Sequence, residues 1–276
     1  MPPGGHLASD HVNAPHVLPD HRSARRLTGV LAATSAVTAA NVYLSQPLLG
    51  AMAASLGAGP ALAGAVATSA QLGYAAGILL LVPLGDSGDR RRLILRLTAA
   101  SAVALAACAL SPTLWWLLAA SFALGLFSPL PQLVTPLAVA LADAREGSGR
   151  VVGTVQAGLL VGVLASRAYS GAFAELTGWR GVYVCSCALT LLLALVLRRH
   201  LPHLPAVGTT TYRALLASLP RLAAHPLVWR VVSSGLLVGV AFGAFWTALS
   251  FLLERHYHYG PAGIGLFGLV AAASPK

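Results

Sequence analysis

Long apolar runs alternate with short polar segments along most of the chain. A transmembrane α-helix needs roughly 20 apolar residues, and the 46 residues from Leu97 to Ala142 carry no charge, enough for two helices divided at Ser111, Pro112 and Thr113. The other runs close to this length are Leu27–Gly50, Ala61–Leu84, Val151–Ala174, Gly181–Leu197 and Val231–Leu253. The pattern predicts an all-α membrane protein with seven spans.

A shorter apolar run follows the seventh span. Ala262–Ser274 has only 13 residues before Pro275 and Lys276, too few to cross a bilayer comfortably. We interpret it as part of an eighth helix in a C-terminally truncated second bundle. The predicted organisation is a disordered cytoplasmic tail (1–26), a six-helix transmembrane bundle (27–197), a basic cytoplasmic loop (198–230) and the start of a second, incomplete bundle (231–276).

Composition supports the membrane assignment. Hydrophobic residues make up 57% of the chain and charged residues only 9%, with a mean hydropathy of +0.74. So few charges cannot cover a soluble surface, so the chain's main partner is a lipid bilayer. The net charge of +10 is spread in clusters between apolar runs, a topological pattern that argues against a nucleic-acid partner.

The basic residues predict an orientation. One predicted side carries fourteen of the eighteen Lys and Arg residues: Arg22, Arg25, Arg26, Arg90, Arg91, Arg92, Arg96, Arg145, Arg150, Arg198, Arg199, Arg213, Arg221 and Arg230. The other side carries Arg180 and Arg255. Cytoplasmic loops retain positive charge. We therefore expect a multi-pass protein of the cell (inner) membrane with its N-terminus in the cytoplasm.

Neither an enzyme nor a metal site is indicated. The three cysteines lie in apolar stretches, and no nucleophile and base pair or intramembrane cluster of His, Asp and Glu is apparent. Histidines recur every five residues from His6 to His21, a spacing that converges on neither a helix nor a strand face. We expect no cofactor and no metal. The segment Tyr212–His225 combines basic and leucine residues, which favours a short amphipathic helix at the membrane surface.

One loop carries a specific resemblance. Between the second and third spans, Pro83–Arg92 places Asp86 four residues before the consecutive arginines Arg90 and Arg91. This loop resembles the signature loop of the major facilitator superfamily, although Val82, Ser87 and Asp89 depart from its usual residues. The resemblance implies two six-helix bundles around a midplane site and a cytoplasmic gate locked by Asp86, Arg90 and Arg91.

Three further segments resemble the drug:proton antiporters, the drug and sugar efflux branch of that superfamily. They are Asn41–Pro47, Gln132–Leu137, and Arg167 together with Gly178–Arg180. The resemblance implies efflux of a small molecule, drug-like or sugar-like, by alternating access, with protons as the coupling ion. No Asp or Glu lies inside the seven predicted spans, so either the coupling residue belongs to the missing part of the second bundle or coupling does not occur here. The alternative is a non-transporting, truncated membrane protein or an interaction partner.

Polar residues within the spans are the candidates for a substrate cavity. Thr34, Thr38, Asn41 and Ser45 share one face of the first helix, which favours cavity lining or hydrogen bonds between helices equally. For Arg167, contact with a substrate or gate competes with snorkelling of the guanidinium to the outer interface. The complete candidate set is Asn41, Tyr43, Gln46, Gln132, Thr135, Gln156, Arg167 and Trp246.

Two features have structural alternatives. Trp246 belongs to an aromatic group on the seventh span that fits either substrate stacking or an interfacial aromatic belt. Pro129, Pro131 and Pro136 surround the fourth-span candidates and predict a kinked helix, whether or not it borders a cavity. A small residue at every fourth position, from Gly158 to Ser170, predicts close approach of another helix to the fifth span.

Overall fold

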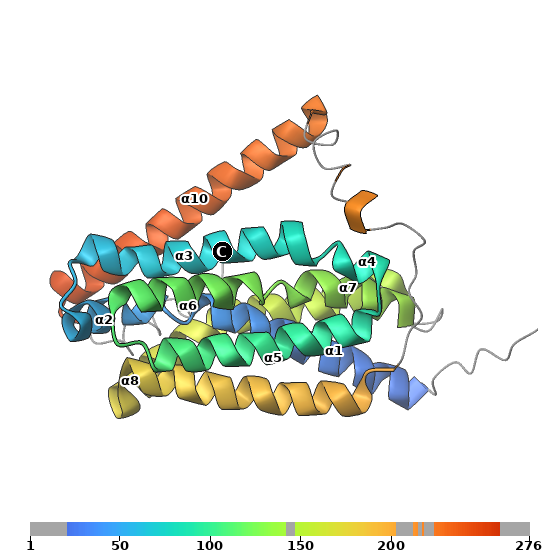
Figure 1. The fold of residues 1–276 in the computed structure, drawn as a ribbon, viewed down its shortest axis with the longest axis horizontal. Helices are drawn as coiled ribbons and strands as arrows, with labels where there is room; N and C mark the ends of the chain where they lie inside the picture. The colour runs from blue at the N-terminus through green and yellow to red at the C-terminus, as the bar shows by residue number, and fades with distance from the viewer. Residues whose placement is uncertain (1–20, 142–146, 203–211, 215–216, 218–223, 260–276) are drawn as a thin grey trace, which may run out of the picture.

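The computed structural model describes residues 21–141, 147–202, 212–214, 217 and 224–259, and throughout these ranges the regular structure is helical (Figure 1). The prediction of an all-α membrane protein is confirmed. Residues 1–20 of the predicted tail, the apolar run from Ala262 and most of the predicted amphipathic segment lie outside the described residues. Residues 21–26, expected to be disordered, are helical.

The first span is broken near its C-terminal end. Helix α1 (His21–Tyr43) is followed by the 3-10 turn η1 (Gln46–Leu48) and by α2 (Leu49–Leu56). The sequence predicts one continuous helix to Gly50, but Pro47 has no backbone N–H and its ring conflicts with the preceding helical turn. The break places Gln46 on a short turn. Helix α3 (Pro60–Leu81) then runs back along the bundle, close to its predicted limits.

Helices α4 (Leu84–Ser87), α5 (Arg90–Ala109), α6 (Leu114–Leu126) and α7 (Leu130–Leu141) continue the bundle. Asp89 caps α5 by accepting a hydrogen bond from the Arg92 backbone N–H at 3.2 Å, and Thr113 caps α6 in the same way at 3.3 Å from Trp116 N. The predicted division at Ser111 to Thr113 is confirmed. The proline-rich fourth span is divided between α6 and α7, and Pro136 lies inside α7.

Helix α8 (Ser148–His200) is two helices that meet at Gly178, whose φ of 71° and ψ of 170° interrupt the helical path. A positive φ is readily adopted by glycine. Helix α10 (Pro226–Arg255) follows. Six described segments are long and apolar enough to cross a membrane. Because α8 contains two of the predicted helices, these segments correspond to the seven predicted spans.

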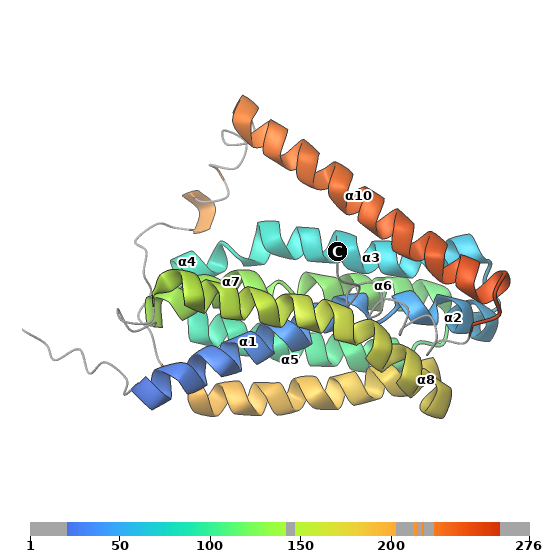
Figure 2. The same cartoon turned by 180° about the vertical axis from the view of Figure 1, so that it is seen from behind.

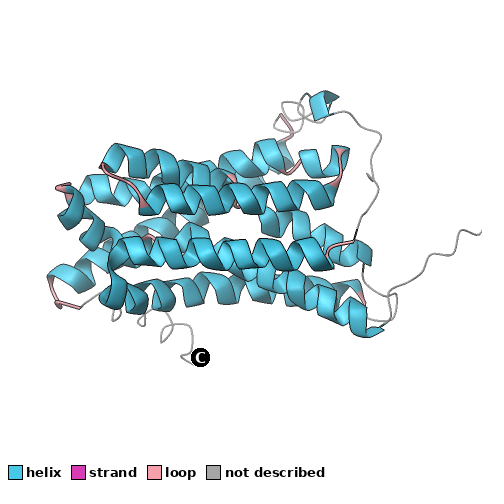
Figure 3. Ribbon diagram, turned by 60° about the horizontal axis from the view of Figure 1, so that its bottom comes forward, coloured by secondary structure: helices cyan, strands magenta, loops and turns pink. Residues whose placement is uncertain are grey.

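The helices pack side by side in one bundle, visible from opposite sides and from below in Figures 1, 2 and 3. Helix α1 packs along α8, and α3 packs along α6. Glycines permit both approaches: a Cβ at Gly162 would overlap the Ala36 carbonyl, and a Cβ at Gly125 would overlap that of Ala70. The contact at Gly162 confirms the predicted close approach at the small-residue stripe.

Helix α10 packs differently from the others. It contacts η1 and α2 near its C-terminal end, where Ser250 and Leu253 are buried. Every residue from Val231 to Val240 is exposed, and the ribbon diverges from α3 toward that end (Figures 1 and 2). The described helices therefore form a bundle with a seventh span attached at one end.

Candidate functional site

A buried arginine lies where α10 meets the bundle. Arg167 is on the first half of α8, and only 2% of its surface is exposed. Its Nη2 donates a hydrogen bond to Oε1 of Gln46 at 2.8 Å. Gln46 reaches it from η1, the turn created by the break before Pro47. Two polar residues 121 positions apart are thus joined inside an apolar bundle.

Aromatic rings surround the Arg167 guanidinium. Its central carbon lies 3.9 Å from the centre of the Trp246 ring, 5.7 Å from that of Phe242 and 5.8 Å from that of Tyr43. Such distances allow attraction between the cation and the ring faces. We call Tyr43, Gln46, Arg167, Phe242 and Trp246 the Arg167 centre. It joins α1, η1 and α8 to α10.

The arginine retains hydrogen-bonding capacity. Its Nε and Nη1 atoms are buried, and neither has a hydrogen-bond partner among the described residues. A buried charge without an acidic partner is costly in a membrane span. The side chain lies inside the protein, which is opposite to the snorkelling alternative, because snorkelling places the charged group at the interface.

The polar face of the first helix is directed into the bundle. Asn41 is buried and its Nδ2 donates to Oγ1 of Thr190, on the second half of α8, at 3.0 Å. The hydroxyls of Thr34 and Thr38 donate to carbonyls of their own helix at 2.8 and 2.7 Å. Of the two interpretations of this face, these contacts match hydrogen bonding within and between helices.

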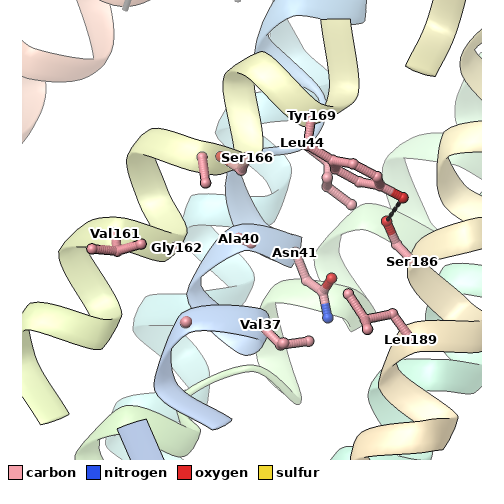
Figure 4. A pocket seen from close by; sticks show the side chains of 12 residues that line it. Val37, Ala40, Asn41, Leu44, Val161, Gly162, Ser166, Tyr169, Ser186 and Leu189 are labelled. Carbon is pink, nitrogen blue, oxygen red and sulfur yellow. Dashed lines mark hydrogen bonds between the residues drawn. The ribbon is translucent and has the colours of Figure 1, made fainter. Parts of the chain in front are cut away.

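An apolar crevice of about 200 Å³ lies between α1 and the two halves of α8 (Figure 4). Asn41, Val37, Gly162 and Ser186 are among its lining residues. The hydroxyls of Tyr169 and Ser186 lie 3.3 Å apart at one edge, as the dashed line in Figure 4 marks. Arg167 does not line this crevice, so the crevice and the Arg167 centre are separate features.

The remaining cavity candidates are dispersed. Gln132 donates from Nε2 to the Tyr74 hydroxyl at 3.1 Å, which joins α7 to α3. Thr135 donates to the Pro131 carbonyl of its own helix at 2.8 Å. Gln156 is exposed and precedes Arg167 by eleven residues, about 16 Å along the helix axis. The structure therefore brings Tyr43, Gln46 and Trp246 to Arg167 and leaves these three apart.

The predicted gate loop forms local ion pairs and one long-range contact. Arg90 pairs with Asp86 at 2.8 Å and also donates from Nε to the Gly85 carbonyl at 2.9 Å. Arg91 donates from Nη2 to the Arg198 carbonyl, near the end of α8, at 2.8 Å. The Asp86 side chain is 59% exposed, so it remains accessible to a further partner.

The opposite end of the bundle has its own connections. Trp179 donates from Nε1 to Oγ of Ser55 at 2.8 Å, and Arg180 donates from Nη2 to the Ser111 carbonyl at 2.9 Å. The Glu254 carboxylate packs directly against Gly50, leaving no room there for a Cβ. The Trp179 and Glu254 contacts join α2 to α8 and α10, and the Arg180 contact joins α8 to the connection between α5 and α6.

Sequence reasoning omitted Phe242 from the candidate site and gave Glu254 no role there. Phe242 precedes Trp246 by four residues, so both face one side of α10, and their rings meet edge to face at 6.1 Å. That spacing is a signal available in the sequence. The contact of Glu254 with Gly50 has no such signal, because it depends on how α10 docks.

These features define a multi-pass, all-α membrane protein with a polar centre buried between its helix bundle and an attached span. The sequence profile of the Major Facilitator Superfamily matches residues 31–275. The chain belongs to this superfamily. The family and the named relatives below are transporters, not enzymes.

Two relatives resemble the chain over most of its length. The uncharacterized transporter YgaY of Escherichia coli O157:H7 is 37% identical over 250 residues, covering 90% of this chain and 63% of that protein. The probable transporter SCO4007 of Streptomyces coelicolor is 37% identical over 259 residues, covering 93% of this chain and 60% of that protein. The chain thus spans less than two thirds of the length of these relatives.

Solved structures share the fold at low sequence identity. A bacterial homolog of the human lysosomal transporter Spinster, in an inward-facing and unoccupied conformation, superposes with a TM-score of 0.73 at 15% identity, covering 92% of this chain and 61% of the other. The xylose transporter XylE of E. coli, in an inward-open conformation, gives 0.54 at 16% identity, covering 76% and 55%. These likenesses concern the fold.

Proposed function

We propose that this chain supplies most of a secondary transporter that exports a small organic molecule across the cell's inner membrane by alternating access. The observation that carries the proposal is the burial of Arg167 between the bundle and α10. A charged residue inside a membrane domain is retained for substrate contact, gating or ion movement more often than for stability. Its location at the contact of two moving parts suits alternating access.

In this proposal, the bundle of residues 27–197 moves as one body relative to the segment that begins at residue 231. The attachment of α10 at one end supports it, because Ser250 and Leu253 are buried there while Val231–Val240 are exposed. Rocking about that attachment changes access from the other end. The positive charge of the loops at that other end supports a cytoplasmic location for it.

Asp86, Arg90 and Arg91 act in this scheme as one side of a cytoplasmic gate. The exposed Asp86 carboxylate and the Arg91 contact with the end of α8 support this role. Efflux of a drug-like or sugar-like molecule, with protons as the coupling ion, rests on the resemblance to the drug:proton antiporters. Glu254 lies eight residues beyond Trp246 on α10. We assign its carboxylate to the outer side of the contact between α10 and the bundle.

Transport is tested by reconstituting the chain into proteoliposomes and measuring the flux of radiolabelled sugars, fluorescent drugs and organic acids, with and without a pH gradient. We expect saturable flux of at least one class in the parent, lost in Arg167→Gln. Arg96→Gln is the matched control, because Arg96 is an exposed arginine at the other end of the bundle. Absence of flux from correctly inserted protein contradicts transport by this chain alone.

A further inference from the structure

We propose that the Arg167 centre binds the anionic group of an organic anion, specifically a carboxylate. The apolar or aromatic body of the same molecule packs on the neighbouring rings. The inference rests on the proposed transport function for its biological meaning, and it names the substrate class. It follows from the hydrogen-bonding capacity that the structure leaves on Arg167.

The first step concerns donors. Four of the five N–H groups of a guanidinium form two edges, Nε with Nη2 and Nη1 with Nη2, and the two N–H groups of each edge match the two oxygens of a carboxylate. Gln46 accepts from Nη2, while Nε and Nη1 have no hydrogen-bond partner among the described residues. A single N–H of Nη2 belongs to only one edge, so the other edge is complete. One carboxylate can therefore be bound through two parallel hydrogen bonds.

The second step concerns charge. The eight acidic residues of the chain are Asp10, Asp20, Asp86, Asp89, Asp143, Glu146, Glu175 and Glu254, and none lies within the seven predicted spans. Among the described residues, Glu175 is exposed and the Glu254 carboxylate packs at Gly50. Among the described residues, no carboxylate pairs with Arg167, and we infer that a ligand anion supplies the opposite charge. Its attraction to the guanidinium is strong because water is excluded there.

The third step concerns shape. The central guanidinium carbon lies over the Trp246 ring, 3.9 Å from its centre, while the Nε and Nη1 donors are buried without a hydrogen-bond partner among the described residues. The ring centres of Phe242 and Tyr43 lie 5.7 and 5.8 Å from the same carbon and add apolar surface around the guanidinium. An aromatic or apolar body attached to the carboxylate is buried against these rings. A small, strongly hydrated anion such as chloride gains none of this contact.

The test compares ligands that share a body and differ in charge. The purified chain in lipid nanodiscs is titrated with 2-naphthoate and with 2-naphthamide, and binding is followed by isothermal titration calorimetry. We expect the carboxylate to bind at least tenfold more tightly than the amide, and acetate to bind weakly. Equal affinities for the carboxylate and the amide overturn the proposal, independently of the results with the variants.

Variants locate the site. In Arg167→Gln we expect the affinity for naphthoate to fall to the affinity for naphthamide. In Arg167→Lys we expect part of the preference for naphthoate to be kept. Arg96→Gln, which removes an exposed arginine elsewhere, leaves the preference unchanged. A preference that persists in Arg167→Gln contradicts this site. Arg167-dependent naphthoate binding without flux contradicts the transport proposal and leaves the anion site standing. Saturable flux that is lost in Arg167→Gln, from a parent that binds naphthoate and naphthamide equally, contradicts the anion site and leaves the transport proposal standing.

Discussion

The guanidinium of Arg167 stacks on the ring of Trp246 at 3.9 Å, and this pair connects the helix bundle to α10. The two residues are 79 positions apart in the sequence. Of the residues of α10, only Ser250 and Leu253 are buried, and the half-buried Trp246 adds a further contact between this helix and the bundle.

Replacing Trp246 therefore weakens the attachment of α10. Gly64 on α3 faces Thr247, because a Cβ on that glycine would lie 3.8 Å from the threonine methyl group. The double variant Gly64→Cys/Thr247→Cys is therefore expected to form a disulfide under mild oxidation. Adding Trp246→Ala removes a cation–π contact worth about 0.5–2 kcal/mol. We expect the docking equilibrium constant of α10 to fall by about 2-fold to 30-fold, which is detected by gel mobility as slower cross-linking.

Trp246→Phe is the matched control for that experiment, because it keeps an aromatic face beside the guanidinium. Its cross-linking rate should lie between those of the parent pair and Trp246→Ala. Equal rates in all three proteins would show that Trp246 does not hold α10.

Gly162 is required for the packing of α1 on α8. In Gly162→Ala the new methyl group overlaps the backbone carbonyl of Ala36, which cannot move without shifting α1. Overpacking of this kind costs about 1–3 kcal/mol. We expect a lower unfolding temperature in detergent. Unfolding is monitored by the reaction of the buried Cys108 thiol with a maleimide dye as it becomes exposed.

Gly153→Ala provides the comparison on the same helix, because nothing lies within 4 Å of a Cβ at that exposed position. Alanine favours a helix over glycine by about 1 kcal/mol, so this variant should unfold at the parent temperature or above. Equal destabilisation by both substitutions would argue against a specific contact at Gly162.

Asp89 caps α5 even though it occupies a position where the family's signature loop usually has glycine. Asp89→Ala removes the acceptor of the Arg92 N–H and the 3.1 Å ion pair with the Arg92 side chain. We expect a loss of about 1 kcal/mol in the free energy of unfolding, measured as a shift in the denaturant midpoint. Asp89→Asn keeps the capping oxygen and should recover most of the loss; if it does not, the ion pair is the larger contribution.

The proposed orientation is tested with a membrane-impermeant maleimide on intact cells. Arg92→Cys lies in the basic loop region, where the Arg92 side chain is 70% exposed, and it should react only after the cells are lysed. Thr177→Cys lies at the exposed turn at the other end of the bundle and should react in intact cells. The protein without either substitution gives the background from the native cysteines. The reverse labelling pattern would show that the protein has the opposite orientation in the membrane.

Apolar run length and charge distribution were sufficient to predict the helices. Seven apolar runs and their polar interruptions were recognisable because a bilayer imposes both the length and the hydrophobicity of each span. The break within the first span was not predicted, although Pro47 was its signal. The loss of the N–H and the ring's steric demand outweighed the continuous apolar pattern around that residue.

The amino-acid sequence alone was enough to establish the class of protein and the order of its spans. It also identified Arg167 as a functional candidate, because the free-energy cost of a charged residue in a membrane span does not depend on knowing its neighbours. It left open whether Arg167 snorkels and which polar residues accompany it. The packing of the helices answered both questions. Docking of α10 on the bundle brings Trp246 and Phe242 to the guanidinium, the broken first span places Gln46 against it, and Asn41 is directed to Thr190 instead. These contacts join segments far apart in the chain, so no local spacing encodes them.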